Sequence, residues 1–422
     1  MASWRCGAAK CGLDASYSAS GVAPDCRVAP KMITAELNRR IQESLCTMIV
    51  PFLKPNPPKL STLSASLEAI EASGVFSNFG PVNTRFERKL CEQMFGGAGS
   101  CMTVCNATIG LMLAIREAIH FSGRLKAKYA LVPSFTFAAT PHAALWCGLT
   151  PILYDVEPGT WLPSRSEEER ILSQYGDDIG VIVPYATFGN CLDFSHYEAL
   201  TKASGIPVVV DAAASLGSLD VDGYGFGRGF SGSIVYSMHV TKTFSTSEGG
   251  IIYTSDSDRM QRLRTMANFG FAEPRSATMP GLNAKISEIG ALIAEAKLAE
   301  IEPIVEQRTE LYSIYRQELP DLEFQTLIGP RTAHQFVPVL LPESFAERRP
   351  YILDKMKSLG VMAASYFSPH VAEQSYFKET CIVEPLLETE KVSAQIVSLP
   401  LHDSLSKAEV DFIAETLRAC MV

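Results

Sequence analysis

Residues 207–211 read Pro207-Val208-Val209-Val210-Asp211, a run of β-branched residues that ends in a carboxylate. Such a run is typical of a strand buried on both faces, as in a parallel sheet covered by helices. Similar apolar runs occur upstream at 129–133, 151–155 and 180–184. Helical patterns separate them, near 107–120, 138–146, 165–175 and 194–203. This alternation predicts an α/β protein whose mostly parallel sheet is covered by helices.

The sequence pattern divides the chain into three parts. Residues 1–30 are rich in Ala, Ser and Gly without a continuous apolar core, and we expect a disordered arm rather than a secretory signal. Residues 31–285 should form a large domain that begins with a helical segment. Residues 286–422 should form a smaller C-terminal α/β domain.

Helix ends and two further strands are also indicated. A first helix is expected near 32–48, and strands at 233–238 and 250–254. Thr84-Arg85-Phe86-Glu87 has the pattern of a capping box, which predicts a helix that begins there and buries Phe86, Leu90 and Met94. Ser406-Lys407-Ala408-Glu409 predicts the same for the last helix.

Composition excludes several classes of function. The net charge is -9 and no stripe of Lys and Arg stands out, which speaks against a nucleic-acid partner. No apolar run is long enough to span a bilayer, so no membrane partner is expected. The 11 cysteines include no CxxC pair and no Cys/His cluster with metal-ligand spacing. Reduced thiols in a cytoplasmic protein without a metal site are therefore expected.

Ligands of an open parallel sheet bind beyond the carboxyl ends of its strands, and three stretches place polar residues there. The first is Cys105-Asn106-Ala107-Thr108, which opens a helix. Free N–H groups and the helix dipole favour phosphate at such a position. Ala107 is small enough for close approach, and Thr108 adds a hydroxyl. The alternative is an ordinary Asn or Thr N-cap, which for this stretch alone is the commoner arrangement.

The second stretch is the strand that ends at Asp211. A buried carboxylate is costly unless a cation meets it. A protonated pyridine nitrogen would serve, and the pairing would keep the ring a strong electron acceptor. The alternative is an Asp that caps the next helix.

The third stretch runs from Ser237 to Lys242 and is followed by Glu248-Gly249-Gly250. A lysine in the loop between two strands can reach the ligand end of the sheet. There, desolvation and a cationic neighbour would free its amine to act as a nucleophile. A surface lysine is the alternative. His239 could relay protons or contact substrate, although a packed histidine is equally compatible with the sequence.

In these features the sequence resembles the DegT/DnrJ/EryC1/StrS sugar aminotransferases, which have the fold-type-I aminotransferase fold. The resemblance runs from about residue 45 to the C-terminus. The stretches that carry it are Ser77-Asn78-Phe79-Gly80-Pro81, Asn106-Ala107-Thr108, Pro133-Ser134-Phe135-Thr136-Phe137, Asp211-Ala212-Ala213, the segment from Ser237 to Lys242, Glu248-Gly249-Gly250, Gly281-Leu282-Asn283 and Ser398-Leu399-Pro400-Leu401.

The resemblance implies pyridoxal 5'-phosphate as cofactor, held by Lys242 as a Schiff base. Lys242 would also shuttle the proton between carbons, and Asp211 would pair with the pyridinium nitrogen. The phosphate would be held by Ala107, Thr108 and Ser237. Phe137 would stack on the ring, while Asn283 would reach the phosphate of the neighbouring subunit in a homodimer with shared active sites.

The implied reaction transfers an amino group from an amino acid, by family analogy glutamate, to a keto sugar that is nucleotide-linked. The alternatives are a keto-cyclitol acceptor, a cofactor-dependent sugar dehydratase of the same family, and a non-catalytic sensor that retains the fold. Two positions depart from the family. Ala214 stands where a Gln near the cofactor's phenolic oxygen is usual, a role that Ser215 or another group would take, and Lys285 replaces the Arg of Asn-x-Arg.

Overall fold

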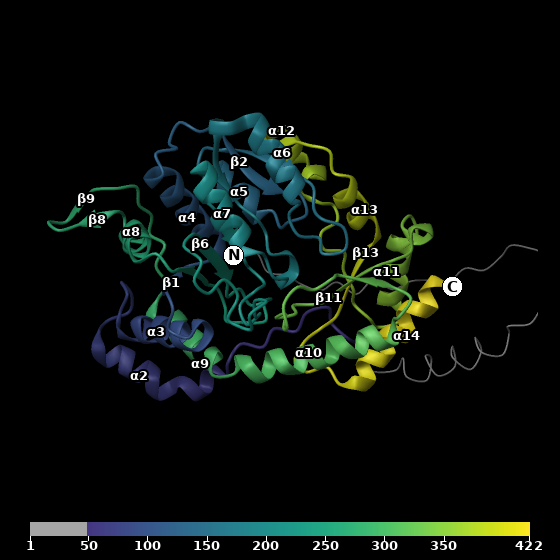
Figure 1. The fold of residues 1–422 in the computed structure, drawn as a ribbon. Helices are drawn as coiled ribbons and strands as arrows, with labels where there is room; N and C mark the ends of the chain where they lie inside the picture. Colours follow the sequence, from purple (N-terminus) through teal and green to yellow (C-terminus); the bar gives the residue numbers. More distant parts are fainter. Residues whose placement is uncertain (1–48) are drawn as a thin grey trace, which may run out of the picture. The chain divides into compact units, whose positions relative to one another are not determined.

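The computed structural model describes residues 49–422, so the arm expected at 1–30 and the helix expected near 32–48 lie outside the described residues. The chain is an α/β protein, as the alternation of strands and helices predicts. Figure 1 shows a large sheet with helices packed around it and a second, smaller sheet formed near the C-terminus.

The large sheet contains the four strands expected from the apolar runs. They are β2 (Tyr129–Pro133), β3 (Thr150–Tyr154), β4 (Ile179–Ile182) and β5 (Val209–Asp211). The predicted parallel pairing is confirmed for β2 with β3 and for β2 with β4. Parallel bridges from Ile182 to Val208 and from Tyr185 to Asp211 join β4 to β5.

Strands β6 (Ser233–Ser237) and β7 (Gly250–Thr254) extend this sheet, with β6 parallel to β5 and β7 antiparallel to β6. Two strands lacked a clear sequence signal. β1 (Ser100–Val104) pairs antiparallel with β7, and the two-residue β12 (Ile382–Val383) pairs parallel with β3. Both stand at an edge of the sheet, so the carboxyl ends of β5 and β6 lie well inside it.

Apolar side chains project from both faces of the large sheet, and helices cover each face. In β2, Leu131 packs into one cluster while Ala130 and Val132 pack into the other, because neighbouring residues of a strand point to opposite sides. The helices expected from the sequence are present. They are α4 (Ala107–Phe121), α5 (Ala139–Trp146), α6 (Arg165–Tyr175) and α7 (Phe194–Ser204), and α8 (Ser257–Ala267) follows β7.

Among the helices before β1, one begins at a different residue from the one predicted. A 3-10 turn, η1 (Leu60–Leu63), leads into α2 (Ser64–Ser73), which ends at Gly74 in the left-handed conformation. The next helix, α3 (Pro81–Phe95), ends in the same way at Gly96. Its expected start at Thr84 is wrong, because the helix begins with Pro81 in its first turn, where the missing N–H costs nothing.

A carboxylate from another helix replaces the expected capping box. The N–H groups of Val82 and Asn83 donate to the two carboxylate oxygens of Glu288, at 2.7 and 3.0 Å. Glu288 is the first residue of α9 (Glu288–Leu298), which packs against α3. The hydroxyl of Thr84 donates to the carbonyl oxygen of Phe79 instead. As predicted, α3 buries Phe86 and Leu90, whereas Met94 is half-buried.

After α9, the long α10 (Ile301–Glu318) leads to the smaller sheet, which is antiparallel. Its strands are β10 (Glu323–Phe324), β11 (Val337–Leu340) and β13 (Ile396–Leu399). α10, α11 (Arg349–Ser358) and α14 (Lys407–Met421) pack with this sheet around one apolar cluster. The capping box predicted for the last helix is confirmed, with Ser406 and Glu409 bonded to each other's backbone N–H groups. Between β11 and β13 lie also α12 (Ser375–Thr380) and α13 (Leu387–Gln395).

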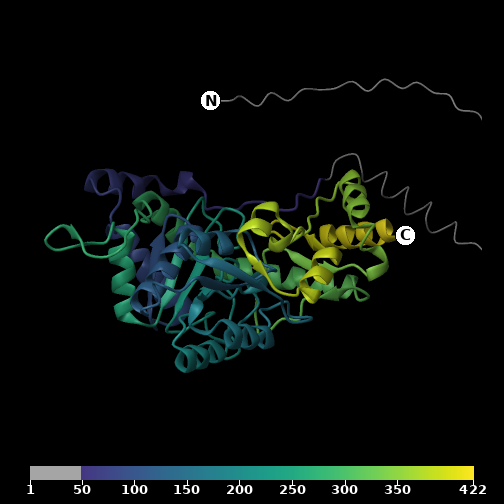
Figure 2. The same cartoon turned by 90° about the horizontal axis from the view of Figure 1, so that it is seen from above.

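Residues 50–59 form an extended strap without helix, as their four prolines require. Val50 bridges to Val361, and the ring of Phe52 lies 5.7 Å from each of the rings of Phe336 and Tyr366. At the far end of the large sheet, β8 (Phe271–Ala272) and β9 (Ser276–Ala277) form a hairpin that projects outward (Figures 1 and 2). Within residues 49–422, no helix combines the length and the apolar character needed to cross a membrane.

Candidate active site

A cavity of about 940 Å³ lies at the carboxyl ends of β5 and β6. Six of the seven residues expected at the site line it, namely Ala107, Thr108, Phe137, Asp211, Ser237 and Lys242. They come from five segments: the first turn of α4, the loop before α5, the end of β5, the end of β6, and the loop after β6. Asn283 is exposed and lies outside this cavity.

Asp211 is the last residue of β5 and is 2% exposed. Its carboxylate accepts a hydrogen bond from the Thr140 hydroxyl at 2.6 Å and one from the N–H of Ala213 at 3.1 Å. Burial raises the pKa of Asp211, while these two bonds and the charge of Lys242 act in the opposite direction. The element that follows is β6, so Asp211 caps no helix. A buried carboxylate with so few donors suits a cationic partner in the cavity.

Lys242 lies in the loop between β6 and β7, where its N–H donates to the carbonyl oxygen of His239 at 2.9 Å. Its Nζ points to Gln335, whose Oε1 accepts a hydrogen bond at 3.1 Å. Burial lowers the pKa of Lys242 to about 8, and the nearby Asp211 charge opposes this change. The side chain is half-buried in the cavity wall, which excludes the alternative of a surface lysine. Its amine is therefore far easier to deprotonate than that of an exposed lysine.

The first turn of α4 supplies two free donors. Asn106 does act as an N-cap, because its Oδ1 accepts from the N–H of Ile109 at 2.9 Å. That cap leaves the N–H groups of Ala107 and Thr108 without an acceptor inside the helix. A Cβ at Gly250 would lie 2.8 Å from the nitrogen of Ala107, so only glycine allows β7 to approach this turn. N-capping and anion binding thus coexist here, because they use different N–H groups.

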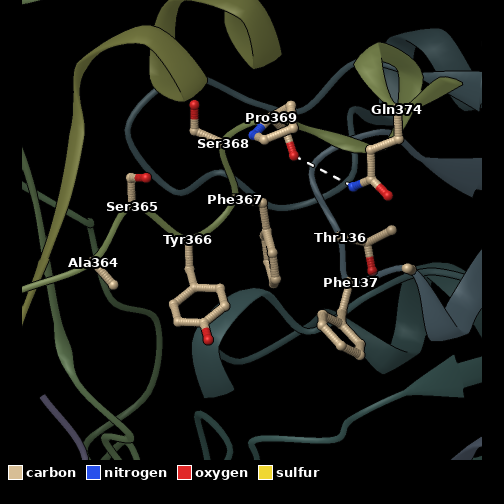
Figure 3. A pocket seen from close by; sticks show the side chains of 10 residues that line it. Thr136, Phe137, Ala364, Ser365, Tyr366, Phe367, Ser368, Pro369 and Gln374 are labelled. Atoms are coloured by element: carbon tan, nitrogen blue, oxygen red, sulfur yellow. Dashed lines mark hydrogen bonds between the residues drawn. The ribbon is translucent and has the colours of Figure 1, made fainter. Parts of the chain in front are cut away.

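Aromatic rings form one wall of the cavity. The rings of Tyr366, Phe367 and Phe137 stand in a row (Figure 3), with Phe367 centred 5.9 Å from Tyr366 and 6.3 Å from Phe137. Phe188 stacks on Phe367 at 5.3 Å and continues the wall. The same rings border a second recess of about 550 Å³, whose lining side chains are drawn in Figure 3. It shares Phe137, Ala138, Tyr366 and Phe367 with the main cavity.

Several residues in or beside the cavity were not among the expected site residues. Thr140, which lies behind the cavity lining, bonds to Asp211, and Gln335 in the lining bonds to Lys242. Tyr185 also lines the cavity, and its burial, together with the charge of Asp211, raises the pKa of its phenol. His239 also lines the cavity, but its ring is bonded within its own loop, with Nδ1 2.8 Å from the Thr241 hydroxyl. Thr140 and Gln335 follow no expected strand end, whereas Tyr185 directly follows the strand expected at 180–184 and His239 lies in the stretch from Ser237 to Lys242.

The two positions that depart from the family pattern lie outside the cavity lining. Ala214 is buried, and the hydroxyl of Ser215 is buried without a hydrogen-bond partner in the described part of the chain. Lys285 donates from Nζ to Asn268 Oδ1 at 2.7 Å and lies over the ring of Phe269.

The model of the DegT/DnrJ/EryC1/StrS aminotransferase family matches residues 61–418 of this chain. The chain belongs to this family. It is a pyridoxal-phosphate-dependent aminotransferase, as the resemblance implied.

Related proteins match this aminotransferase over most of its length. The crystal structure of a putative PLP-dependent aminotransferase from Bacillus cereus ATCC 10987 is 36% identical with a TM-score of 0.83, and covers 88% of this chain and 100% of its own. The crystal structure of DesI in the presence of its TDP-sugar product is 28% identical with a TM-score of 0.77, and covers 88% and 93%. The dTDP-4-amino-4,6-dideoxy-D-glucose transaminase of Shigella dysenteriae is 27% identical over 86% of this chain and 97% of that protein.

The cavity of this aminotransferase fits pyridoxal phosphate. The first turn of α4 and the Ser237 hydroxyl suit the phosphate, and the buried carboxylate of Asp211 suits a protonated ring nitrogen. Lys242 offers an amine that can bond covalently to an aldehyde. These donors and charges are complementary to the groups that the cofactor presents.

The lowered pKa of Lys242 predicts how cofactor attachment depends on pH. Only the neutral amine attacks an aldehyde, so the rate constant for attachment to apoenzyme should rise about tenfold per pH unit below the pKa and level off above about 8. Stopped-flow absorbance between pH 6 and 10 measures this rate. A rate that kept rising beyond pH 9.5, as for an ordinary lysine, would contradict the desolvated environment.

Proposed function

We propose that this aminotransferase moves an amino group from glutamate to a keto sugar carried on a nucleotide. The observation that carries the proposal is the convergence of Lys242, Asp211 and the free N–H groups of α4 on one aromatic-walled cavity. The kinship with DesI, whose structure contains a TDP-sugar product, supports the acceptor class. So does kinship with the Shigella transaminase named for a dTDP-linked amino sugar.

The wall of the cavity supports a deoxy sugar in particular. Tyr366, Phe367, Phe188 and Phe137 offer flat apolar faces, against which the C–H face and methyl group of a 6-deoxy sugar can lose their hydration. The lining also includes a few polar side chains, among them Thr241 and Glu248, that can meet hydroxyl groups of the sugar. This mixture of apolar walls and few polar groups is usual for small-molecule sites.

Each residue of the site has a separate role in the proposed reaction. Bound pyridoxal phosphate supplies an electron-accepting ring that stabilises negative charge on the carbon that loses a proton. Asp211 would keep the ring nitrogen protonated, because a positive partner adds to the two hydrogen bonds that stabilise its buried negative charge. The first turn of α4 and Ser237 anchor the phosphate and so fix the ring.

Lys242 takes part in both half-reactions. Once its amine is displaced by the substrate, Nζ lies free in the cavity and can accept a proton from one carbon and return it to another. A pKa of about 8 places Nζ close to neutral pH, where a group can both take and release a proton. Phe137 lines the same cavity, in a position compatible with stacking on the ring.

The site is proposed to be complete only in a homodimer. Asn283 is exposed and bridges Asn268 near the projecting hairpin, outside the cavity of its own chain. That position is compatible with the expected reach of Asn283 to the phosphate bound by a second copy. The cytoplasm remains the expected location of such an enzyme.

The amine form of the enzyme tests the proposed acceptor. Incubation with glutamate should release one equivalent of 2-oxoglutarate per active site and shift the visible spectrum. Addition of a dTDP-4-keto-6-deoxy sugar should reverse that shift, whereas a keto-cyclitol should not. If only the cyclitol reversed the spectral shift, the acceptor would be a keto-cyclitol and not a nucleotide-linked keto sugar. Loss of water from the sugar without any 2-oxoglutarate would favour the dehydratase alternative, and no spectral change with any substrate would favour a non-catalytic sensor.

A further inference from the structure

Lys242 makes a single hydrogen bond from Nζ within residues 49–422, and its acceptor is Oε1 of Gln335 at 3.1 Å. Gln335 lies just before β11, in a part of the chain far from the lysine loop. A lysine chain has four rotatable bonds, so its free amine samples many positions unless a partner fixes it. The hydrogen bond to Gln335 selects the position in which the nitrogen faces the cavity.

Gln335 is itself held from both sides. The ring of His334 is buried and stacks on Tyr312 of α10, with ring centres 4.0 Å apart and planes 10° apart. On the other side, Phe336 contacts Phe188 in the aromatic wall, with ring centres 4.9 Å apart. Both neighbours are packed, so the backbone of Gln335 has little freedom to move.

A buried arginine joins this segment to the lysine loop. Nη1 of Arg308 donates to the carbonyl oxygen of His334 at 3.0 Å and to the hydroxyl of Thr243 at 3.4 Å. Thr243 is the neighbour of Lys242, and its hydroxyl donates to the same carbonyl oxygen at 3.0 Å. The residues that follow Lys242 and precede Gln335 therefore meet at one guanidinium group.

The charge of Arg308 is balanced on its other edge. Nε and Nη2 both lie 2.6 Å from Oδ1 of Asp403, and the two side chains are 5% and 9% exposed. Oδ2 of Asp403 accepts from the Asn56 amide at 2.7 Å. Such a buried pair gains little stability over apolar packing, but it fixes geometry strictly, because a displaced partner would leave a buried charge unpaired.

We infer that Gln335 is a positioning residue that orients the free amine of Lys242 for proton transfer, and that the Arg308–Asp403 pair keeps Gln335 and the lysine loop in register. The inference rests on the proposed role of Lys242. Donation of one N–H to Gln335 leaves the nitrogen lone pair of the neutral amine free to accept a proton. A lysine without this partner would reach the reacting carbon only part of the time.

Substitutions at Gln335 test the direct contact. Gln335→Leu removes the acceptor at similar size and should lower kcat roughly 10- to 100-fold with little change in KM. Gln335→Glu places a carboxylate beside Nζ, which should raise the pKa of Lys242 and move the pH profile of cofactor attachment to higher pH. A wild-type kcat in the leucine variant, or an unmoved profile in the glutamate variant, would refute the role of Gln335.

Arg308→Met tests the clamp, with Arg262→Met as its matched control. Arg262 also makes a two-nitrogen contact to a buried carboxylate, with Nε and Nη2 at 2.7 and 2.6 Å from Glu117, on α8 and α4 away from the cavity lining. Both variants should lose stability in thermal unfolding. Only Arg308→Met should also slow cofactor attachment to apoenzyme and lower kcat by the factor seen for Gln335→Leu. Equal losses of attachment rate and kcat in both variants would show that Arg308 has only a structural role.

The attachment assay separates this inference from the proposed function. It needs no sugar, so a wrong acceptor class leaves it unaffected. Attachment that persisted in Lys242→Ala would refute the lysine assignment itself. Attachment that required Lys242 but ignored both Gln335 and Arg308 would refute the inference alone.

Discussion

Replacement of Lys242 by alanine should lower turnover by about 10³-fold or more, because one side chain supplies both the covalent attachment and the proton transfer. The variant should still bind pyridoxal phosphate through Asp211 and the first turn of α4, which it leaves intact. Borohydride should then no longer fix the cofactor to the protein. Mass spectrometry of the reduced protein and a glutamate half-reaction measure the two losses separately.

The control for this experiment is Lys128→Ala. Lys128 lies just before β2, is 62% exposed and pairs with Asp178 at the surface. It should retain full turnover and the reducible cofactor. If Lys242→Ala kept a tenth of the wild-type rate, or still formed a borohydride-stable adduct, another amine would have to carry the chemistry.

Asp211→Asn should affect the loaded and the cofactor-free protein in opposite directions. In the loaded enzyme a neutral amide cannot balance a protonated ring nitrogen, and loss of one member of a buried ion pair costs about 3–5 kcal/mol. We therefore expect cofactor affinity or kcat to fall by roughly 10²- to 10³-fold. Equilibrium titration and half-reaction rates measure these effects.

In the cofactor-free protein, Asp211→Asn should have the opposite effect and leave stability unchanged or higher. Burial raises the pKa of Asp211 in the folded state, so ionising this carboxyl opposes folding, and the loss of stability develops as pH rises through the raised pKa. Asparagine removes that charge, so the melting temperature of apoenzyme should stay equal or rise near pH 8. Asp211→Asn apoenzyme that melted well below wild type would show that the carboxylate is satisfied without a cation.

The strands of the large sheet were predictable because their burial on both faces leaves uninterrupted apolar runs, such as 207–211. β1 was missed because Ser100 and Thr103 interrupt its apolar residues, and β12 because two residues give no period. The start of α3 was placed wrongly at Thr84 because a local motif was preferred to Pro81. The carboxylate that caps this helix comes from Glu288, which no local pattern can indicate.

The same distinction holds for the site. Asp211, Ser237 and the turn at Ala107 were predictable because each lies where a strand ends or a helix begins, and Lys242 follows in the next loop. Gln335, Thr140 and Arg308 act through side chains brought together by the tertiary fold. Their sequence neighbourhoods resemble ordinary loop or helix positions, so only the distances to Asp211, Lys242 and Thr243 reveal them.

The carboxylate of Glu288 at the start of α3 also bears on how the chain is assembled during synthesis. Translation produces α3 long before residue 288, so its first two N–H groups must remain bonded to water while the central strands emerge from the ribosome. The helix can settle against the sheet in its final form only when α9 arrives to complete it. The N-terminal end of α3, an early helix, can therefore be capped only after the much later residue 288 has been synthesised.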